Sequence, residues 1–500
     1  MKWLKFWVKE TKKPDSSFDL QLLEMDFFCQ LAYMAAIATS GIARSGLFYH
    51  AAKLPYIAAR FFRRVDFVAK MFNHDYSQAC RIVGEKTKEP GIKALLLRLS
   101  GALSSGEDIA AFLAREAMVL SENYGNSYER RLELLRTWGD AYIALVMTSA
   151  LVTVMSVVTM MIGSVTASFI ISLASLTILS TIFGAWFLYH TAPRESVNHS
   201  LPHRSREQEL ARNLAKLILP IGGIVLVCLL IMKVNIGLLL IVGSIFLFPV
   251  GFVVMIDDNK VSRRDDDIAA FLRSLGGVMR AIGATATEAM GRLDFRSLGI
   301  LKEDAGLLYT RLLANITPYG CWDRFVCETG SELVNRSVRS FWDGVTLGGE
   351  PQKVANEASS FALKISLLRA QRRQIASGFT WLTIAMHVVL TTLSVFVYSV
   401  FVTFYQLVKT LMPGSGAMQS MPSMPTFGLF AQGNMQLDLL HFMVLLIIFM
   451  LTLANAFAIY SVSGGHILKL LFYTALTAGI SGAVLISVPP VVGMIFKMTS

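Results

Sequence analysis

The chain has 500 residues, of which 54% are hydrophobic and only 16% are charged, and its formal net charge is +11. So few charges cannot cover a soluble globule of this size, and the apolar residues lie in blocks of the length that membrane spans require, about 18 or more residues. Composition therefore excludes an ordinary soluble protein. The positive charge does not indicate nucleic-acid binding, because no basic stripe with interleaved aromatic residues is present.

The N-terminal residues 1–140 are predicted to contain a leading segment and a first helical module. Residues 1–13 carry lysines and aromatic residues that suit a short interfacial helix, although a frayed helix is the simpler explanation, and they lack the pattern of a signal peptide. Within the module, apolar residues at three- and four-residue spacing predict a helix: Phe27, Leu31, Met34 and Ala35.

Two breaks divide the rest of this module. The segment 86–91 contains lysines followed by Pro and Gly, which predicts the end of a helix. Gly106 and Glu107 then form a turn, because glycine accepts the left-handed conformation that follows a helix, and the next helix is expected to begin at Ile109.

Apolar blocks follow. Residues 141–188 contain no Asp, Glu, Lys or Arg and are long enough for two spans, with a tight turn expected near Gly163 and Ser164. The polar linker 189–213 comes next. Residues 214–256 provide a third and a fourth span, joined by a short turn at Lys233.

A second helical module is predicted over residues 257–378. Asp265, Asp266 and Asp267 precede an apolar stripe, and carboxylates favour the N-terminal end of a helix, so a helix is expected to begin there. Capping is a better explanation of these carboxylates than a metal site, because three consecutive side chains on a helix point in different directions. The stripe consists of Ile268, Phe271, Leu272, Leu275, Met279 and Ile282.

Two further helix boundaries are predicted in this module. The stretch from Thr285 to Glu288 has the pattern of a capping box, which starts a helix. Gly348, Gly349 and Glu350 end one helix and Pro351 opens the next, since proline suits the first helical turn.

The last third of the chain contains a fifth span at 379–405, an external loop at 406–437 and two more spans within 438–496. Seven crossings place residues 1–140, 189–213 and 257–378 on one side of the membrane. These three segments hold most of the 46 Lys and Arg residues. By the positive-inside rule, both modules and the linker are expected in the cytoplasm and the C-terminus outside the cell membrane.

The two modules repeat one another. Four features recur at an offset of 241 to 243 residues, which scattered coincidence does not produce. The matched features are Gly106–Glu107 with Gly349–Glu350, the segment 114–117 with 355–358, Arg130–Arg131 with Arg372–Arg373, and Trp138 with Trp381. The sequence thus predicts an all-α, polytopic membrane protein with about seven transmembrane helices and two duplicated cytoplasmic helical bundles.

No pattern for catalysis, cofactor binding or metal binding is present. The chain lacks the nucleotide-binding, hydrolase, zinc-protease and calcium-loop motifs, and its five cysteines form no metal or disulfide pattern, so they are expected to be free thiols. Within the spans the ionisable residues are His387 and His441, for which hydrogen-bonded packing is a simpler role than a proton relay. The protein is therefore not expected to be an enzyme or an ion-coupled transporter.

Arginines near the membrane are the remaining candidates for a functional surface. They are Arg130, Arg131 and Arg136 after the first module, and Arg369, Arg372 and Arg373 after the second. Contact with anionic lipid explains each one most simply. Because the pair recurs in both modules, we also predict a docking surface for an acidic cytoplasmic partner.

The duplicated module, its Gly-Glu turn and its Arg-Arg approach to the membrane resemble the type II secretion system F domain family, the assembly-platform proteins of type IV pilus, type II secretion and archaellum machines. Four spans between the copies and three after the second are more similar to the archaeal branch, the archaellum assembly protein J family and its pilus relatives. The resemblance covers both modules and the spans that follow them.

This resemblance implies a membrane platform that works as a small homo-oligomer, a dimer or a trimer. It further implies a hexameric cytoplasmic secretion ATPase as the source of work, and pilin-like or archaellin-like subunits as the cargo that leaves the bilayer. A permease subunit of an ATPase-driven transporter is the alternative function.

Overall fold

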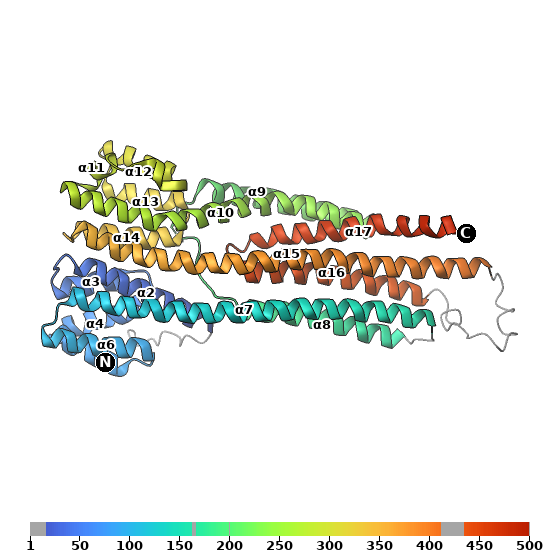
Figure 1. The fold of residues 1–500 in the computed structure, drawn as a ribbon, viewed down its shortest axis with the longest axis horizontal. Coiled ribbons are helices and arrows are strands. Elements are labelled where there is room, and N and C mark those ends of the chain that lie inside the picture. Colours follow the sequence, from blue (N-terminus) through green and yellow to red (C-terminus); the bar gives the residue numbers. More distant parts are fainter. Residues whose placement is uncertain (1–16, 163–166, 200, 412–434, 500) are drawn as a thin grey trace. The chain divides into compact units, whose positions relative to one another are not determined.

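The computed structural model describes residues 17–162, 167–199, 201–411 and 435–499. These residues form helices and no sheet, apart from one isolated antiparallel bridge between Asn198 and Ser331 (Figure 1). The all-α prediction is confirmed. Three predictions lie outside the described residues, namely the helix at 1–13, the turn at Gly163–Ser164 and most of the loop 406–437.

The first module contains five helices and the start of a sixth. Its α2 buries Phe27, Leu31, Met34 and Ala35, as the helical spacing predicted. The chain break predicted at 86–91 separates α5 from α6, and α7 begins at Ile109 as expected. The helices are α2 (Ser17–Ala38), α3 (Arg44–Lys53), α4 (Ala59–Met71), α5 (Tyr76–Lys86), α6 (Pro90–Ser105) and α7 (Ile109–Ile162).

The second module has the same series of helices. Thr285 caps α11 by accepting a hydrogen bond from the Glu288 N–H, as the capping box predicted. Its helices are the C-terminal part of α10 (Ile236–Ile282), α11 (Ala286–Gly291), the short 3-10 helix η1 (Phe295–Leu301), α12 (Lys302–Leu313), α13 (Pro318–Thr329), α14 (Glu332–Thr346) and the start of α15 (Pro351–Leu411).

Helix starts establish the repeat more firmly than the sequence matches do. α3 and α11, α5 and α13, α6 and α14, and α7 and α15 each begin 242 residues apart, and α4 and α12 begin 243 residues apart. Backbone conformation repeats as well. Residues with positive φ angles lie 242 residues apart in three pairs, which are Gly41 with Gly283, Asn73 with Asn315, and Gly106 with Gly348.

This register corrects one of the sequence matches. The glycine that ends α14 in the left-handed conformation is Gly348, with φ 91°, and it is Gly348 rather than Gly349 that corresponds to Gly106, with φ 75°. Gly349 has a different constraint, because a Cβ there would lie 2.7 Å from a Val354 methyl and 2.8 Å from the Gly344 carbonyl oxygen. Glu107 pairs with Arg115, and Glu350 pairs with Arg280 and Lys353.

Contacts divide the chain into two compact units. The first unit contains residues 1–130, 193–206 and 258–370, and so includes both modules; the second contains 131–192, 207–257 and 371–500. These boundaries differ from the predicted ones by ten residues or fewer. Within the first unit, the ring of Phe28 in α2 lies 5.0 Å from the ring of Phe361 in α15, so the two modules share one apolar core.

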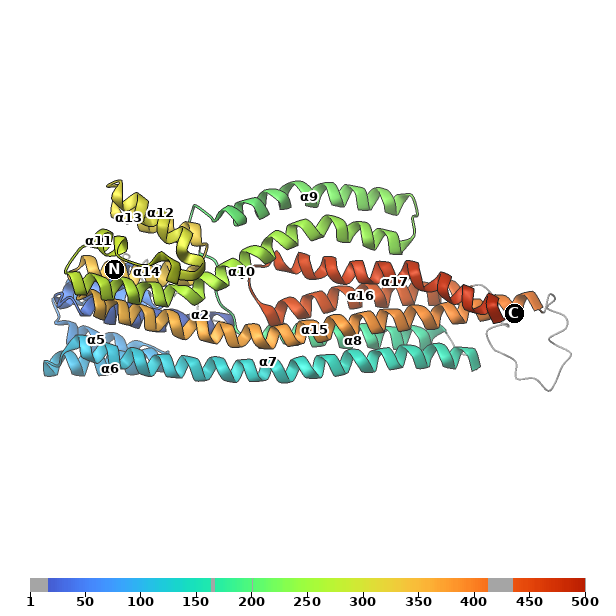
Figure 2. The ribbon, with the colours of Figure 1, turned by 45° about the horizontal axis from the view of Figure 1, so that its top comes forward.

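The second unit holds the long apolar helices, including α8 (Ala167–Thr191), α9 (Arg206–Ile231), α16 (Met435–Ser463) and α17 (Lys469–Thr499) (Figure 2). In the described part of the chain, six helices are long and apolar enough to cross a membrane, and they coincide with six of the seven predicted spans. The first predicted span is the C-terminal part of α7. Some of its side chains are not described, so this span stays a prediction.

His387 in the second unit is fully buried and satisfied. Its Nε2 lies 3.1 Å from the Thr477 carbonyl oxygen and 2.9 Å from the Ser481 hydroxyl, and Nδ1 lies 3.0 Å from the Asn455 amide. Asn455 in turn accepts a hydrogen bond from the Tyr142 hydroxyl. These contacts link α7, α15, α16 and α17 and agree with the packing role predicted for His387.

The predicted helix start at Asp265–Asp267 is wrong. These residues lie inside α10, which runs without a break from Ile236 to Ile282. Asp265 is buried, and Asp267 accepts a hydrogen bond from the Ile300 N–H. Acidic residues after an apolar span resemble an N-terminal cap, but here they lie where one continuous helix leaves its apolar stretch and enters the second module.

Candidate functional site: an ion-pair network around the connecting segment

The segment between α8 and α9, residues 193–206, will be called the connecting segment. It belongs to the same compact unit as both modules. The Arg194 N–H donates to the side-chain carbonyl of Gln21 in α2, at 3.0 Å. The Glu332 N–H at the start of α14 donates to the Val197 carbonyl oxygen, at 2.9 Å. The connecting segment is therefore held by one module at one end and by the other module further along.

Arg369 in α15 binds this segment through a buried ion-pair cluster. Its Nε lies 2.7 Å from a Glu195 oxygen, and its Nη1 lies 2.6 Å from an Asp265 oxygen. Nη2 donates to the Ser196 carbonyl oxygen, and the Tyr128 hydroxyl donates to Glu195. One guanidinium thus joins the connecting segment to α10, while Tyr128 adds α7.

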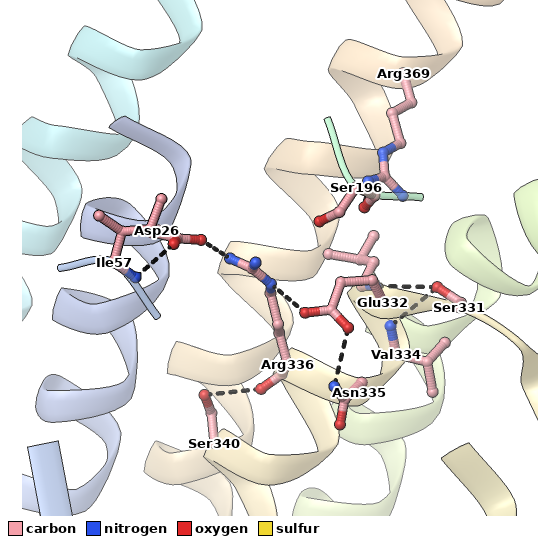
Figure 3. A network of polar contacts seen from close by, with 11 residues as sticks. Asp26, Ile57, Ser196, Ser331, Glu332, Val334, Asn335, Arg336, Ser340 and Arg369 are labelled. Carbon is pink, nitrogen blue, oxygen red and sulfur yellow. Dashed lines mark hydrogen bonds and ion pairs between the residues drawn. The ribbon is translucent and has the colours of Figure 1, made fainter. Parts of the chain in front are cut away.

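A second buried cluster surrounds Arg336 in α14 (Figure 3). Arg336 donates to Asp26 at 2.7 Å and to Glu332 at 2.8 Å, and its guanidinium lies 4.5 Å from the centre of the Tyr56 ring. Burial disfavours the charged form of Arg336, but the neighbouring carboxylates favour it, and the pKa of Arg336 lies well above its usual value. Because Asp26 belongs to α2, this cluster joins the two modules directly.

Ser331 connects the two clusters. Its hydroxyl donates to Asp265 of the first cluster and accepts hydrogen bonds from the N–H groups of Leu333 and Val334 (Figure 3). Ser331 is thereby the N-cap of α14, whose first residue is Glu332 of the second cluster. A further buried pair, Arg264 with Asp304 at 2.8 Å, lies on α10 and α12.

The network has the composition of a mechanical joint. The carboxylates of Asp26, Glu195, Asp265 and Glu332 each already face an arginine. Removing one partner would leave an uncompensated buried charge, which is costly, so the clusters resist separation of the segments that they join. Among the described residues, no group of three His, Cys, Asp or Glu side chains is arranged to hold a metal ion.

His199 anchors the connecting segment to α13. Its Nδ1 accepts a hydrogen bond from the Leu201 N–H at 3.2 Å, so the proton is on Nε2, which donates to the Cys327 carbonyl oxygen at 3.4 Å. Burial lowers the pKa of His199 below its usual value of about 6.5. The native contact thus requires the neutral ring.

Acidification should therefore loosen the connecting segment. Because the folded protein binds the His199 proton less readily than the unfolded chain, this contribution to stability is complete above pH ~6.5 and is lost as the pH falls through the lowered pKa. After correction for intrinsic rates, hydrogen exchange at the Glu332 and Leu201 amides should rise more between pH 7 and pH 5 in the wild type than in His199→Gln. The amides of α5 provide the internal control. Equal pH dependence in the two proteins would contradict this assignment.

The six arginines predicted to dock a partner have different environments. Arg130 and Arg136 are exposed on α7, and Arg131 and Arg373 are partly exposed. Arg369 is buried in the first cluster. Arg372 is also buried, and donates to the carbonyl oxygens of Ser461 and Val462 at the end of α16. Docking stays a prediction, and the solvent-facing residues available for it are Arg130 and Arg136, with Arg131 and Arg373 in part.

Sequence reasoning missed Asp26, Glu195, Glu332 and Arg336. Each is a charged residue whose sequence neighbours give no sign of burial, and Asp26 and Arg336 are 310 residues apart. A partial signal was present for the cysteines. Four of the five are buried and all five are free, and burial raises the pKa of the Cys29 thiol to about 11.

Comparison with known proteins gives two relatives. The chain is 23% identical over 336 residues to the Flagella accessory protein J of Methanococcus voltae, a match that covers 63% of this chain and 59% of that protein. It is 25% identical over 318 residues to the Flagella accessory protein J of Methanocaldococcus jannaschii, covering 61% of this chain and 56% of that protein. The matches thus span less than two thirds of either relative. No family model and no solved structure matches. The polytopic, all-helical chain is accordingly similar, over about three-fifths of its length, to two proteins that carry the name Flagella accessory protein J.

Proposed function

We propose that this protein is a membrane assembly-platform component of an archaellum or a related type IV pilus-like filament machine. The observation that carries the proposal is the similarity to two proteins named Flagella accessory protein J. A multi-pass, all-helical chain with a duplicated module is compatible with that role. The F domain resemblance of the repeated Gly-Glu and Arg-Arg features supports it independently.

The proposal includes the partners that the resemblance implies. A hexameric cytoplasmic secretion ATPase supplies the work, pilin-like or archaellin-like subunits are the cargo, and the platform is a small homo-oligomer. The chain itself is not an enzyme in this scheme. Both modules face the cytoplasm and the C-terminus faces outward, in keeping with the concentration of Lys and Arg residues in the modules and the linker.

The ion-pair network suggests how a module transmits a displacement. The connecting segment leads from α8 directly into α9, both of which are apolar helices. Since Arg369 and the Glu332 amide hold this segment, a movement of the second module would act on both helices through it. In addition, α7, α10 and α15 each continue without interruption from a module into an apolar stretch. Continuous helices and buried ion pairs are suitable parts for passing force.

The experiment that tests this function is a deletion strain examined by electron microscopy. Deletion should remove one type of surface filament, and the wild-type gene should restore it. A double variant, Arg130→Glu with Arg136→Glu, should restore few or no filaments if these exposed arginines dock the ATPase. Arg64→Glu is the matched control, because Arg64 is also an exposed arginine in a module helix, and it should restore filaments fully.

The outcomes separate the parts of the proposal. Normal filaments in the deletion strain would refute the platform function. Full restoration by the double variant would refute arginine docking but not the platform function. The alternative, a permease subunit, predicts instead that purified protein in proteoliposomes transports a solute when its ATPase is supplied.

A further inference from the structure

The turns between α4 and α5 and between α12 and α13 repeat one unusual backbone conformation. Asn73 and Asn315 have φ angles of 51° and 59°, and they are two of three non-glycine residues with positive φ in the described chain. Asparagine tolerates this left-handed conformation better than most residues, and it fixes the direction of the turn. We call residues 71–75 and 313–317 the Asn turns.

Both Asn turns expose large apolar side chains. Met71 and Phe72 of the first turn are 67% and 63% exposed, and Leu313 and Ile316 of the second are 59% and 50% exposed. Met71 and Leu313 occupy the same position, two residues before the asparagine. Tyr319, just beyond the second turn, is 54% exposed. A single exposed apolar residue needs no explanation, but adjacent ones at the same turn of both modules indicate a binding surface.

The charged groups beside the Asn turns are already paired within the protein. Lys70 lies 2.8 Å from Asp66, and Arg311 lies 2.6 Å from Glu328. Asp75 accepts hydrogen bonds from Ser77 as the N-cap of α5. Neither turn therefore presents the cluster of unpaired basic residues that contact with anionic lipid or nucleic acid requires. What the turns offer to a partner is mainly apolar.

We propose that the Asn turns are two equivalent docking knobs that enter apolar pockets on one homo-oligomeric protein partner. The duplication supports this choice, because two copies of one surface on one chain match a partner that presents one pocket more than once. Two weak contacts to the same partner reinforce each other, since the second forms at a high effective concentration. This inference rests on the proposed function in taking the secretion ATPase as that partner.

The test measures binding of the full-length chain, in lipid nanodiscs, to the purified secretion ATPase of the same cell. The variants are Met71→Ser with Phe72→Ser, Leu313→Ser with Ile316→Ser, and all four changes together. Each pair should weaken binding about tenfold, and the fourfold variant should weaken it about a hundredfold or more, because both contacts are lost. Met118→Ser is the matched control, since Met118 in α7 is 67% exposed and lies outside the turns. It should bind as the wild type does.

Failure of this inference is distinguishable from failure of the proposed function. If the wild type does not bind the ATPase, the proposed coupling fails. If the wild type binds and the fourfold variant binds equally well, the docking knobs are refuted while the coupling stands. Loss of binding from only one pair would refute the equivalence of the two turns. Self-association that disappears in the fourfold variant would assign the turns to a second copy of this chain and overturn the proposal.

A fluorescent label distinguishes a protein pocket from the bilayer. An environment-sensitive dye is attached to His74→Cys in a Cys228→Ala background, because Cys228 is the exposed cysteine of the wild-type chain. Its emission should shift to the blue when the ATPase is added. A blue shift on transfer from detergent into nanodiscs, before any ATPase is present, would place the turn in lipid and overturn the proposal.

Discussion

Replacing Arg336 by methionine should lower the free energy of unfolding by about 3–5 kcal/mol, the range for breaking a buried ion pair by removing one partner. Methionine fills much of the arginine volume but leaves Asp26 and Glu332 without their cation. The exposed fractions of these two side chains are 7% and 11%, so water cannot readily replace the lost partner. Chemical unfolding of the purified protein in detergent, monitored by a signal from the modules, measures the change.

Two further variants show whether the loss comes from stranded charge. Arg280→Met removes an exposed pair with Glu350 at 3.1 Å and should change stability by about 1 kcal/mol or less. Adding Asp26→Asn and Glu332→Gln to Arg336→Met should recover much of the stability, because no buried charge then lacks a partner. A loss no greater than that of Arg280→Met would contradict the role assigned to the cluster.

Gly251→Ala should destabilise the second unit at or above the upper end of the ~1–3 kcal/mol range for overpacking. Gly251 lies in α10 against α17, and an added Cβ would stand 2.3 Å from the Phe472 backbone nitrogen and 2.5 Å from its Cα. A flexible side chain could move aside, but here the backbone of α17 itself must shift. Thermal unfolding in detergent, together with the yield of monodisperse protein, measures the effect.

The control for this prediction is the same substitution on the same helix. A Cβ at Gly243 would meet the Leu226 methyl carbons at 3.6 and 3.7 Å, which is ordinary van der Waals contact. Gly243→Ala should therefore be tolerated, with a gain of up to ~1 kcal/mol from helix propensity. If both substitutions have the same effect, the close approach of α10 and α17 at Gly251 is incorrect.

Local chemistry made much of the helical framework predictable. Glycines, prolines and caps act over a few residues, so the sequence was sufficient to predict the ends of α5 and α14 and the starts of α6, α7, α11 and α15. The long apolar blocks similarly predicted the six helices able to span a membrane. The same local rules failed at Asp265, because a carboxylate beside an apolar stripe has the same sequence pattern at a helix start and inside a helix that continues.

The candidate site was much less predictable. Of the six arginines that drew attention, Arg369 and Arg372 proved to be buried among internal partners, and Arg336 at the centre of the second cluster was not noticed. Sequence position did not distinguish an exposed arginine from one that holds the connecting segment. The equivalence of the Asn turns was also missed, because few of their residues match and the repeat lies in the backbone conformation.

The sequence by itself determined an all-helical, apolar chain with two copies of one module, because hydrophobic periodicity, span length and helix-end residues act within a few turns of the chain. Only the tertiary structure decided which charges are buried and what they join. Asp26, Glu195, Asp265, Arg336 and Arg369 come together from helices and segments far apart in the sequence, and their burial is tolerable only because each finds its partner there.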